Sequence, residues 1–420
     1  MQTETETGTG TETDTEIVVV GGGIAGLSLA SALARDGRAV TVLEATLEYE
    51  DRVRGESMVP WGVAEAKDLG VLPTLLDAGA RTSETWVHYD ELVPTEISLA
   101  NRIPAGMMLP GIPGSLNLRH PEACTALAKQ ATHNGAHVLR GVSGVEVRAG
   151  GRPTVRAVVA GEALELQPRL VVGADGRAST VRRQVGIQLE RQPVSHMIAG
   201  LLVDGLDDVD LNHDFLATTD DLFMASFRQH PGQIRVYLCP GLRQKDRFAG
   251  PGGVAEFLRS SAFPCLPFGE QLAAGRPSGP LATYPGDDTW TPEPYVPGVV
   301  LMGDAAGYNS PIIGQGLSIA LRDARIVRDT IRSGDLSPAG FAAYGAERTE
   351  RMRRLRSAAT FMASVATDDC DTSKARRAAF FDLQQHEPLM MGLLGAMYAG
   401  PEQGPAEAFD GRLHERILAA

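Results

Sequence analysis

The sequence predicts an α/β fold with a Rossmann-like nucleotide-binding domain, and three observations support this. At residues 17–27 a β-branched run leads into a Gly-x-Gly-x-x-Gly motif and an alanine-rich helical pattern. A second strand pattern, 39–44, ends in an acidic residue. Two further buried-strand patterns, 170–176 and 298–304, end in glycine and aspartate. This order places polar residues at the carboxyl ends of strands, where open α/β sheets bind nucleotides.

Each glycine of the motif has a physical role in holding a pyrophosphate. Gly21 allows the tight turn from strand to helix, Gly23 lets the phosphates approach the backbone, and Gly26 lets the helix pack closely on the strand. The phosphates would lie on free N–H groups at the positive end of the helix dipole. Glu44 stands 21 positions beyond Gly23, where a carboxylate would accept both hydroxyls of an adenosine ribose.

Size and composition are those of an ordinary globular protein. The 420 residues suffice for two or three structural units, and 43% of them are hydrophobic. The net charge of −13 disfavours nucleic acid or an anionic membrane as the main partner. The uncharged run 17–34 is rich in glycine and falls short of the ~20 residues of a membrane span. Residues 1–15, dominated by Thr, Glu and Gly, are expected to be a disordered tail.

Cysteine and histidine spacing predicts neither a disulfide framework nor a metal site. The four cysteines are scattered, without a Cys-x-x-Cys pair, and the nine histidines show no His-x-x-x-His spacing. We therefore expect reduced thiols in a cytoplasmic protein.

Several further segments suit a ligand, but each has an ordinary alternative. Arg54, in an Arg-Gly-Glu loop, could meet a phosphate or stand in solvent. Asp175 and Asp304, at the ends of buried strands, could bind a ligand or cap a helix. The segment 314–316 offers a second helix N-terminus for negative charge, or is a plain turn.

The rest of the chain suggests a second sheet and a helical end. Alternating and apolar runs over 83–108 and 194–280 predict a mostly antiparallel sheet. The arginine-dense stretch from Arg348 to Arg356 is expected to be a solvated helix face. We expect a nucleotide-binding domain from 16–82, 109–193 and 281–335, a substrate-binding sheet domain from 83–108 and 194–280, and a helical region from 336–420.

The motifs occur in one characteristic order, from about residue 16 to 335. The glycine fingerprint, Arg54-Gly-Glu, Gly173-Ala-Asp-Gly and Gly303-Asp-Ala-Ala, followed by Pro311 and Gly314-Gln-Gly-Leu, resembles the class A FAD-dependent monooxygenases of the para-hydroxybenzoate hydroxylase type. The resemblance implies FAD, with NADPH or NADH as a transient reductant and O2 as co-substrate. It also implies hydroxylation of a small aromatic or electron-rich compound through a flavin C4a-hydroperoxide. We expect a monomer or homodimer that binds no nucleic acid and spans no membrane.

The same resemblance assigns contacts to FAD along the whole motif set. A helix N-terminus beside the flavin would stabilise the negative charge that reduction places at N1 and the C2 oxygen. The implied contacts are Gly21, Gly23, Ile24, Ala25 and Gly26 to the pyrophosphate, Glu44 to the adenosine ribose, Arg54 and Arg119 to phosphate or ribityl groups, Val142 to adenine, Asp175 to FAD and NAD(P)H, Gly303 and Asp304 to the ribityl chain, and Pro311, Gly314, Gln315, Gly316 and Leu317 to the isoalloxazine.

Departures from the family pattern leave other flavin functions open. Gly307 stands where the hydroxylases often have histidine or arginine, and Ser318 where they often have asparagine. The Gly-Glu-Ser57 segment is also similar to flavin-dependent halogenases, but their Trp-x-Trp-x-Ile-Pro segment is missing. A flavin oxidoreductase that reduces double bonds, or an FAD-bound interaction protein without activity, stays open.

Activation of a phenol requires a base or a hydrogen-bond relay that faces the substrate. Alternation shows only which face of a sheet a side chain shares, so each candidate could equally be structural. The candidates on the expected substrate sheet are His88, Tyr89, His196, Arg228 and Tyr237.

Overall fold

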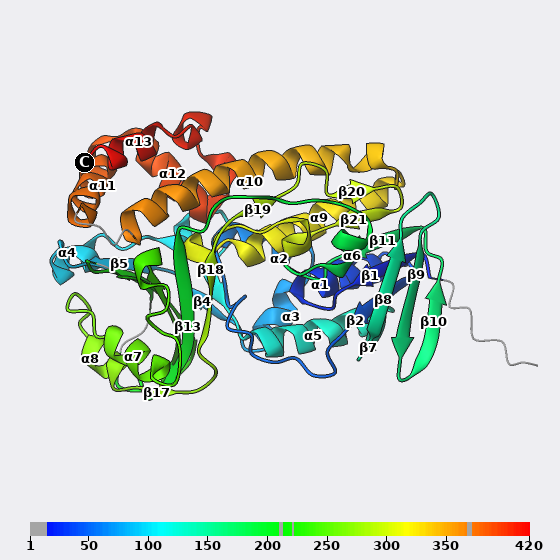
Figure 1. Ribbon diagram of the computed structural model, residues 1–420, viewed down its shortest axis with the longest axis horizontal. Coiled ribbons are helices and arrows are strands. Elements are labelled where there is room, and N and C mark those ends of the chain that lie inside the picture. The colour runs from blue at the N-terminus through cyan, green and yellow to red at the C-terminus, as the bar shows by residue number, and fades with distance from the viewer. Residues whose placement is uncertain (1–14, 210–212, 221, 368–371) are drawn as a thin grey trace, which may run out of the picture.

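The computed structural model describes residues 15–209, 213–220, 222–367 and 372–420. The expected disordered tail, 1–15, lies outside these residues except for its last position. Within them, two neighbouring sheet regions are joined by a long helix of the C-terminal region that runs along both (Figure 1). The predicted α/β class is confirmed.

The nucleotide-binding region is built on a six-stranded sheet in the order β20-β21-β11-β1-β2-β7. Its strands run parallel except β20, which pairs antiparallel with β21. Every residue of β1 is buried, because helices α1, α5 and α9 cover one face and the sheet β8–β10 covers the other. The bounds are β1 Ile17–Val20, β2 Val40–Glu44, β7 His137–Arg140, β8 Ser143–Arg148, β9 Thr154–Val159, β10 Glu162–Leu166, β11 Leu170–Gly173, β20 Tyr295–Val296, β21 Val299–Leu301, α1 Ile24–Arg35, α5 His120–His133 and α9 Gly316–Ser333.

A small sheet and two short helices follow the second strand. Strand β6 (Ser115–Asn117) pairs with β3 (Ser57–Met58) and β4 (Arg81–Ser83). Helices α2 (Pro60–Asp68) and α3 (Leu72–Asp77) are separate. The helical stretch is interrupted before Pro73. This proline lies in the first turn of α3, where its missing N–H costs no hydrogen bond.

The second sheet has seven strands in the order β17-β13-β16-β15-β14-β5, with β18 also paired to β13. Neighbours are antiparallel except β5 and β14. Helices α7 and α8 cover one face, and side chains from the other face pack toward the C-terminal helices. The bounds are β5 Trp86–Asp90, β13 His196–Asp204, β14 Asp214–Thr218, β15 Leu222–His230, β16 Gln233–Pro240, β17 Arg276–Pro277, β18 Ala282–Gly286, α7 Gly253–Ser260 and α8 Gly269–Ala273.

Two details differ from the sequence-based expectation. The stretch 83–108 contributes one strand to this sheet, β5, and then forms helix α4 (Thr95–Ala100) and the turn η1 (Ala105–Met107). We expect the chain to re-enter the nucleotide-binding domain at residue 281, but strand β18, which follows this residue, hydrogen-bonds to β13 of the second sheet. We propose the same domain division with this return placed after Gly286.

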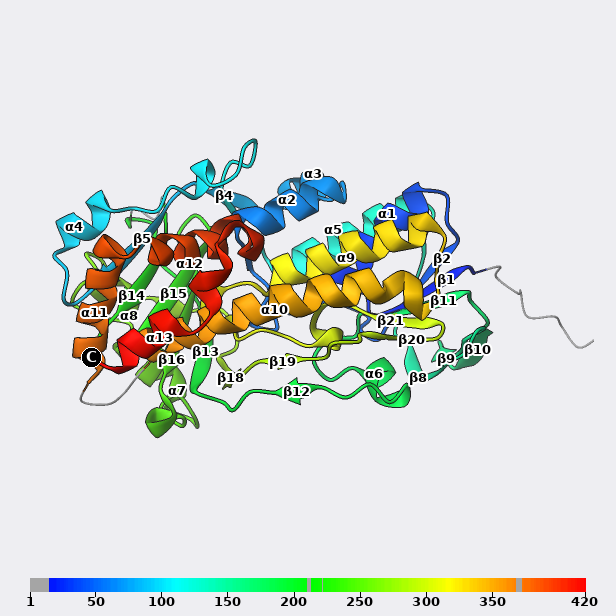
Figure 2. The same cartoon turned by 90° about the horizontal axis from the view of Figure 1, so that it is seen from above.

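The C-terminal region is helical, as expected. Helix α10 lies beside α9 and extends over the second sheet, where α11–α13 pack against it (Figure 2). The bounds of these and the remaining short elements are α6 Thr180–Gln184, β12 Glu190–Arg191, η2 Leu242–Gln244, β19 Thr289–Trp290, η3 Gly303–Ala306, η4 Pro311–Ile313, α10 Pro338–Ala366, α11 Ser373–His386, α12 Pro388–Ala399, η5 Pro401–Gln403, η6 Ala406–Phe409 and α13 Arg412–Leu418.

The expected solvated arginine face is wrong for Arg348 and Arg351, which are 1% and 3% exposed. Both pair with Asp323 of α9, at 2.9 and 2.7 Å. Arg348 also donates to the carbonyls of Gly303 at 3.0 Å and Gly307 at 2.7 Å, and Asp323 accepts the Gly303 N–H at 2.8 Å. Burial disfavours ionisation of Asp323, but the two guanidinium charges outweigh it and lower its pKa. This cluster therefore fixes η3 to α9 and α10.

Replacing Arg348 with methionine should lower the free energy of unfolding by about 3–5 kcal/mol, the usual cost of breaking a buried ion pair. The cause is that the buried Asp323 carboxylate keeps only one of its two guanidinium partners, Arg351, and that backbone carbonyls such as that of Ala306 lose their donor. Urea unfolding of the FAD-free protein measures it. The control is Arg353→Met, at a half-exposed pair with Glu350, where about 0–1 kcal/mol is expected. Equal losses in the two variants would contradict the role given to Arg348.

Candidate cofactor and substrate site

A cavity of about 1070 Å³ lies between the two sheet regions. Its walls come from the carboxyl ends of β1, β2 and β11, from η3 and the start of α9, and from the face of the second sheet opposite α7 and α8. Ligand pockets usually measure about 300–1000 Å³. The cavity therefore has room for a large cofactor together with a small second ligand.

The glycine motif forms one end of this cavity. Helix α1 begins after Gly23, and no side chain in the described part of the chain caps its N–H groups. A Cβ on Gly23 would meet nothing within 4 Å, so this position opens on the cavity, as do Ile24 and Ala25. Gly26 is not in the wall. A Cβ there would lie 2.0 Å from the Gly21 carbonyl oxygen, so it permits the close contact of helix and strand.

Glu44 is fixed at the same end by three hydrogen bonds. Its Oε2 accepts the Gly22 N–H at 2.6 Å, and its Oε1 accepts the Thr46 N–H at 2.8 Å and the Thr46 hydroxyl at 2.7 Å. The carboxylate is nearly buried, lies in the cavity wall and retains acceptor capacity on Oε2. It is therefore held ready for a hydroxyl donor, and it also orders the glycine loop.

The start of α9 provides a second N-terminus on the same cavity. Gly314, Gly316 and Leu317 line it, and among the described residues no side chain caps the helix. Gln315 is turned away: it accepts from Trp61 Nε1 at 2.8 Å and donates to backbone carbonyls. Its role is to hold the loop in place. Two helix N-termini without caps thus face one cavity, an arrangement that favours negatively charged ligand groups.

Most of the other residues that are predicted to contact FAD line the cavity, but Arg119 does not. Arg54, Val142, Gly303 and Pro311 line the cavity, as do Gly21, Asp175 and Asp304. Asp304 lies 3.6 Å from Arg177 Nε. Asp175 also accepts the N–H groups of Thr180 and Val181, so it binds the start of α6, and its contact with a ligand stays a prediction. Arg119 is absent from the wall and pairs with Glu122, while its neighbour His120 lines the cavity.

The other end of the cavity is apolar and aromatic. Alternate residues of β13, β15, β16 and β18 point into it because the covered face of the sheet holds the intervening positions. The side chains are Ile198, Phe223, Ala225, Phe227, Tyr237, Cys239 and Tyr284.

Tyr237 is the one catalytic candidate that the structure places in this wall. Its hydroxyl donates to Glu56 Oε2 at 2.5 Å, and Glu56 Oε1 accepts from Arg235 Nε at 2.8 Å. Arg235 also pairs with Asp51 at 2.5 Å. Burial raises the pKa of Glu56, although Arg235 and the Tyr237 hydrogen bond oppose the shift. Burial and the neighbouring Glu56 raise the pKa of Tyr237.

The remaining catalytic candidates lie elsewhere. His88 bonds to Thr218 at 3.1 Å beside the rings of α11, and burial lowers its pKa to about 4. Tyr89 bonds to His213 in the core beneath the sheet. Arg228, near the end of β15, is outside the cavity wall, and His196 lines a separate pocket. Alternation identified the strands, but it could not show which part of a face borders the cavity.

Several lining residues were missed in the sequence. Glu56 is the last residue of the Arg54-Gly-Glu motif, and Arg177 directly follows Gly173-Ala-Asp-Gly, so the motifs themselves were the signal that could have identified both. Phe223 and Phe227 alternate along one strand, a pattern that equally describes a core.

Comparison with known proteins agrees with this geometry. A family model described as an FAD binding domain matches residues 14–247, and a model described as squalene epoxidase matches 167–346. Squalene monooxygenase SE2 of Panax ginseng is 25% identical over 341 residues, 75% of this chain and 58% of that protein. Squalene epoxidase erg1 of Aspergillus fumigatus is 28% identical over 329 residues, 75% and 66%. The chain thus spans about three fifths of the length of the first such relatives.

Solved structures show the same fold. The p-nitrophenol 4-monooxygenase PnpA of Pseudomonas putida is 21% identical, with a TM-score of 0.77 over 92% of this chain and 98% of that one. PqsL of Pseudomonas aeruginosa, a probable FAD-dependent monooxygenase, is 20% identical, with a TM-score of 0.71 over 84% and 97%. Within the described residues, no helix combines the length and apolar character that crossing a bilayer requires.

Replacing Gly26 with alanine should weaken FAD binding about tenfold or more, because the new Cβ overpacks the turn against the Gly21 carbonyl. Titration of the FAD-free protein, followed by flavin fluorescence, measures the dissociation constant. Gly395→Ala is the matched control, since it adds the same methyl group to helix α12 in open space. Wild-type affinity in Gly26→Ala would refute the packing argument.

Replacing Asp304 with alanine should also reduce FAD affinity, by about 10- to 100-fold if it removes a hydrogen bond to a charged group. The same titration reads the effect, with the exposed Asp77→Ala on α3 as control. Full FAD occupancy of Asp304→Ala at low flavin concentration would exclude Asp304 from the contacts.

Proposed function

The chain belongs to the FAD-binding-domain family, and we propose that it is a FAD- and NAD(P)H-dependent monooxygenase that hydroxylates a small electron-rich aromatic compound. One observation carries the proposal: a single cavity connects two uncapped helix N-termini with an aromatic wall that contains the Tyr237–Glu56 pair. Bound FAD supplies hydride uptake from NAD(P)H and transfer of oxygen from O2.

The fit to FAD rests on the donors of both helix starts. The N–H groups after Gly23 suit the pyrophosphate, and the fixed Glu44 carboxylate suits the adenosine ribose. The N–H groups at the start of α9 would stabilise negative charge on the reduced ring system. Asp304 and Arg54 lie in the wall between these ends and suit ribityl and phosphate groups.

The aromatic end suits a planar apolar substrate. Phe223, Phe227 and Tyr284 offer ring faces and edges, which favour stacking with a second aromatic ring. These side chains also exclude water from the place of oxygen transfer, which protects the reaction from hydrolytic side reactions.

Tyr237 and Glu56 provide a route for a proton. The phenolic oxygen of Tyr237 can accept a hydrogen bond from a substrate hydroxyl while its own proton is held by Glu56 Oε2. The pKa of Glu56 is raised by burial, which makes its carboxylate a stronger proton acceptor. Arg235 compensates the charge of this carboxylate and connects it to Asp51. The pair therefore favours a substrate with an ionisable hydroxyl.

Epoxidation of an alkene is the second candidate. The relatives named squalene monooxygenase and the apolar wall both favour it. An alkene, however, has no hydroxyl for the buried Tyr237–Glu56 pair. Reduction of a double bond without oxygen transfer is the remaining alternative. NADH or NADPH preference, cytoplasmic location and a monomeric or dimeric state stay predictions.

A screen of phenols, aminobenzoates and linear alkenes with NADH and NADPH tests the proposal. The expected result is one O2 consumed and one hydroxylated product formed per nicotinamide oxidised, with a phenol among the best substrates. Epoxide formation from alkenes alone would favour the second candidate. A reduced product without O2 consumption would contradict monooxygenation.

Replacing Tyr237 with phenylalanine should lower kcat for a phenolic substrate by about 10²–10⁴-fold, the usual contribution of a positioned proton-transfer group. FAD affinity should stay at the wild-type value, because the change removes only the hydroxyl at the substrate end. Steady-state rates and flavin titration measure both. Tyr398→Phe, a buried tyrosine outside the cavity wall, is the control. An unchanged kcat in Tyr237→Phe would remove this residue from the proposed relay.

A further inference from the structure

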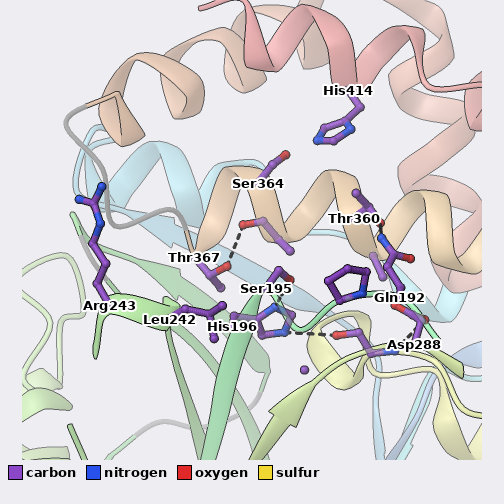
Figure 3. Close-up of a pocket in the computed structure, with 15 residues that line it drawn as sticks. Gln192, Ser195, His196, Leu242, Arg243, Asp288, Thr360, Ser364, Thr367 and His414 are labelled. Atoms are coloured by element: carbon purple, nitrogen blue, oxygen red, sulfur yellow. Dashed lines mark hydrogen bonds between the residues drawn. The ribbon is translucent and has the colours of Figure 1, made fainter. Parts of the chain in front are cut away.

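Figure 3 shows a second pocket, of about 450 Å³. Its lining residue Ser310 stands between Asn309 and Pro311, which line the cofactor cavity. The second pocket is bounded by the segment before β13, by η2, by the end of β18, and by helices α10 and α13. It shares no lining residue with the first cavity among the described parts of the chain. Nothing in the proposed oxidation uses it.

The lining of this pocket is rich in hydrogen-bond acceptors. The Ser364 hydroxyl donates to the Phe361 carbonyl at 2.7 Å, and the Thr367 hydroxyl donates to the Ala363 carbonyl at 2.8 Å. Both hydroxyl protons are therefore used within α10, and oxygen lone pairs are left for a ligand. The Gln192 side-chain amide donates an N–H to the Thr360 hydroxyl oxygen at 2.9 Å, so its carbonyl oxygen is also left to accept from a ligand.

Asp288 adds a negative charge at one end. Its Oδ1 accepts from Asn309 Nδ2 at 2.6 Å and from the Ser310 N–H at 3.0 Å. Its Oδ2 has no protein partner in the described part of the chain and is left for a ligand. Burial raises the pKa of Asp288 to about 6, so it is mainly ionised at neutral pH.

Positive charges near this carboxylate are few on the pocket side. Burial lowers the pKa of His196 to about 4 and also lowers that of His414, so both are neutral. Arg243 lies at the opposite end of the pocket from Asp288 (Figure 3). The Arg356 guanidinium lies over the Trp290 ring, 3.9 Å from its centroid and outside the lining, and its charge partly opposes the effect of burial on the pKa of Asp288. A cationic donor is therefore the ligand group that suits the Asp288 end.

The wall between the two pockets is hydrogen-bonded to the cofactor loop. His196 Nε2 bonds to the Ser310 hydroxyl at 3.2 Å, and Asp288 holds Asn309. Asn309, Pro311 and Ile312 line the cofactor cavity. A ligand on Asp288 thus contacts a group that positions this loop.

We propose that the second pocket binds a small primary amine, with its ammonium group on Asp288 and its apolar part against Leu242, Ala359 and Ala363, and that its occupancy alters the flavin environment through residues 309–312. The proposal requires bound FAD but not the monooxygenase activity.

Benzylamine is the probe, with benzyl alcohol and benzoate as controls of similar shape. Calorimetry on the FAD-loaded protein at neutral pH should show one binding site for benzylamine. Its dissociation constant should be at least about tenfold lower than that of benzyl alcohol, and benzoate should not bind. Benzylamine should also shift the flavin absorption spectrum. Equal affinities for amine and alcohol, no amine binding, or an unchanged spectrum would overturn the proposal.

Three variants locate the site. Asp288→Asn should weaken benzylamine binding about tenfold through loss of the charge. Ala363→Leu fills the second pocket and should abolish binding, whereas Ala225→Leu, the same change in the cofactor cavity, should leave it intact. The reverse pattern would place the amine in the cofactor cavity and refute a second site. The leucine pair decides the question even if Asp288→Asn does not fold.

Discussion

Two helix starts that face one cavity without caps are the feature on which the rest of the structure depends. Free N–H groups at a helix N-terminus carry partial positive charge and require a partner. In α1 the glycine turn keeps side chains away from these groups, and in α9 Gln315 turns its side chain toward Trp61 instead. The ligand is therefore the group that satisfies both ends, and a long dinucleotide meets this requirement.

Keeping the two helix starts at a fixed separation requires support from distant parts of the chain. Arg348 of α10 holds η3 by its carbonyls, and Asp323 of α9 holds the N–H of Gly303. The C-terminal region therefore stabilises the position of η3 in the cavity wall, although it contains none of the sequence motifs. The same helix continues over the second sheet and forms one wall of the second pocket.

Local sequence was sufficient to predict the fold of the nucleotide-binding half, because this fold is marked by short motifs. The turn at Gly23 and the acid at Glu44 need only a strand before them and a helix or loop after them. The prediction for Arg348 was wrong because its partner, Asp323, stands 25 positions earlier. The sequence does not show whether a charged residue has an oppositely charged partner in the fold. Tyr237 and His88 have similar alternating contexts, and only the packing of the second sheet separates them.

A crystal structure of the FAD-loaded protein tests the central claim most directly. The account predicts the pyrophosphate at the N–H groups that follow Gly23 and the flavin ring beside the start of α9, with Tyr237 across the remaining space. A flavin ring bound away from α9, or phosphates away from α1, would contradict it.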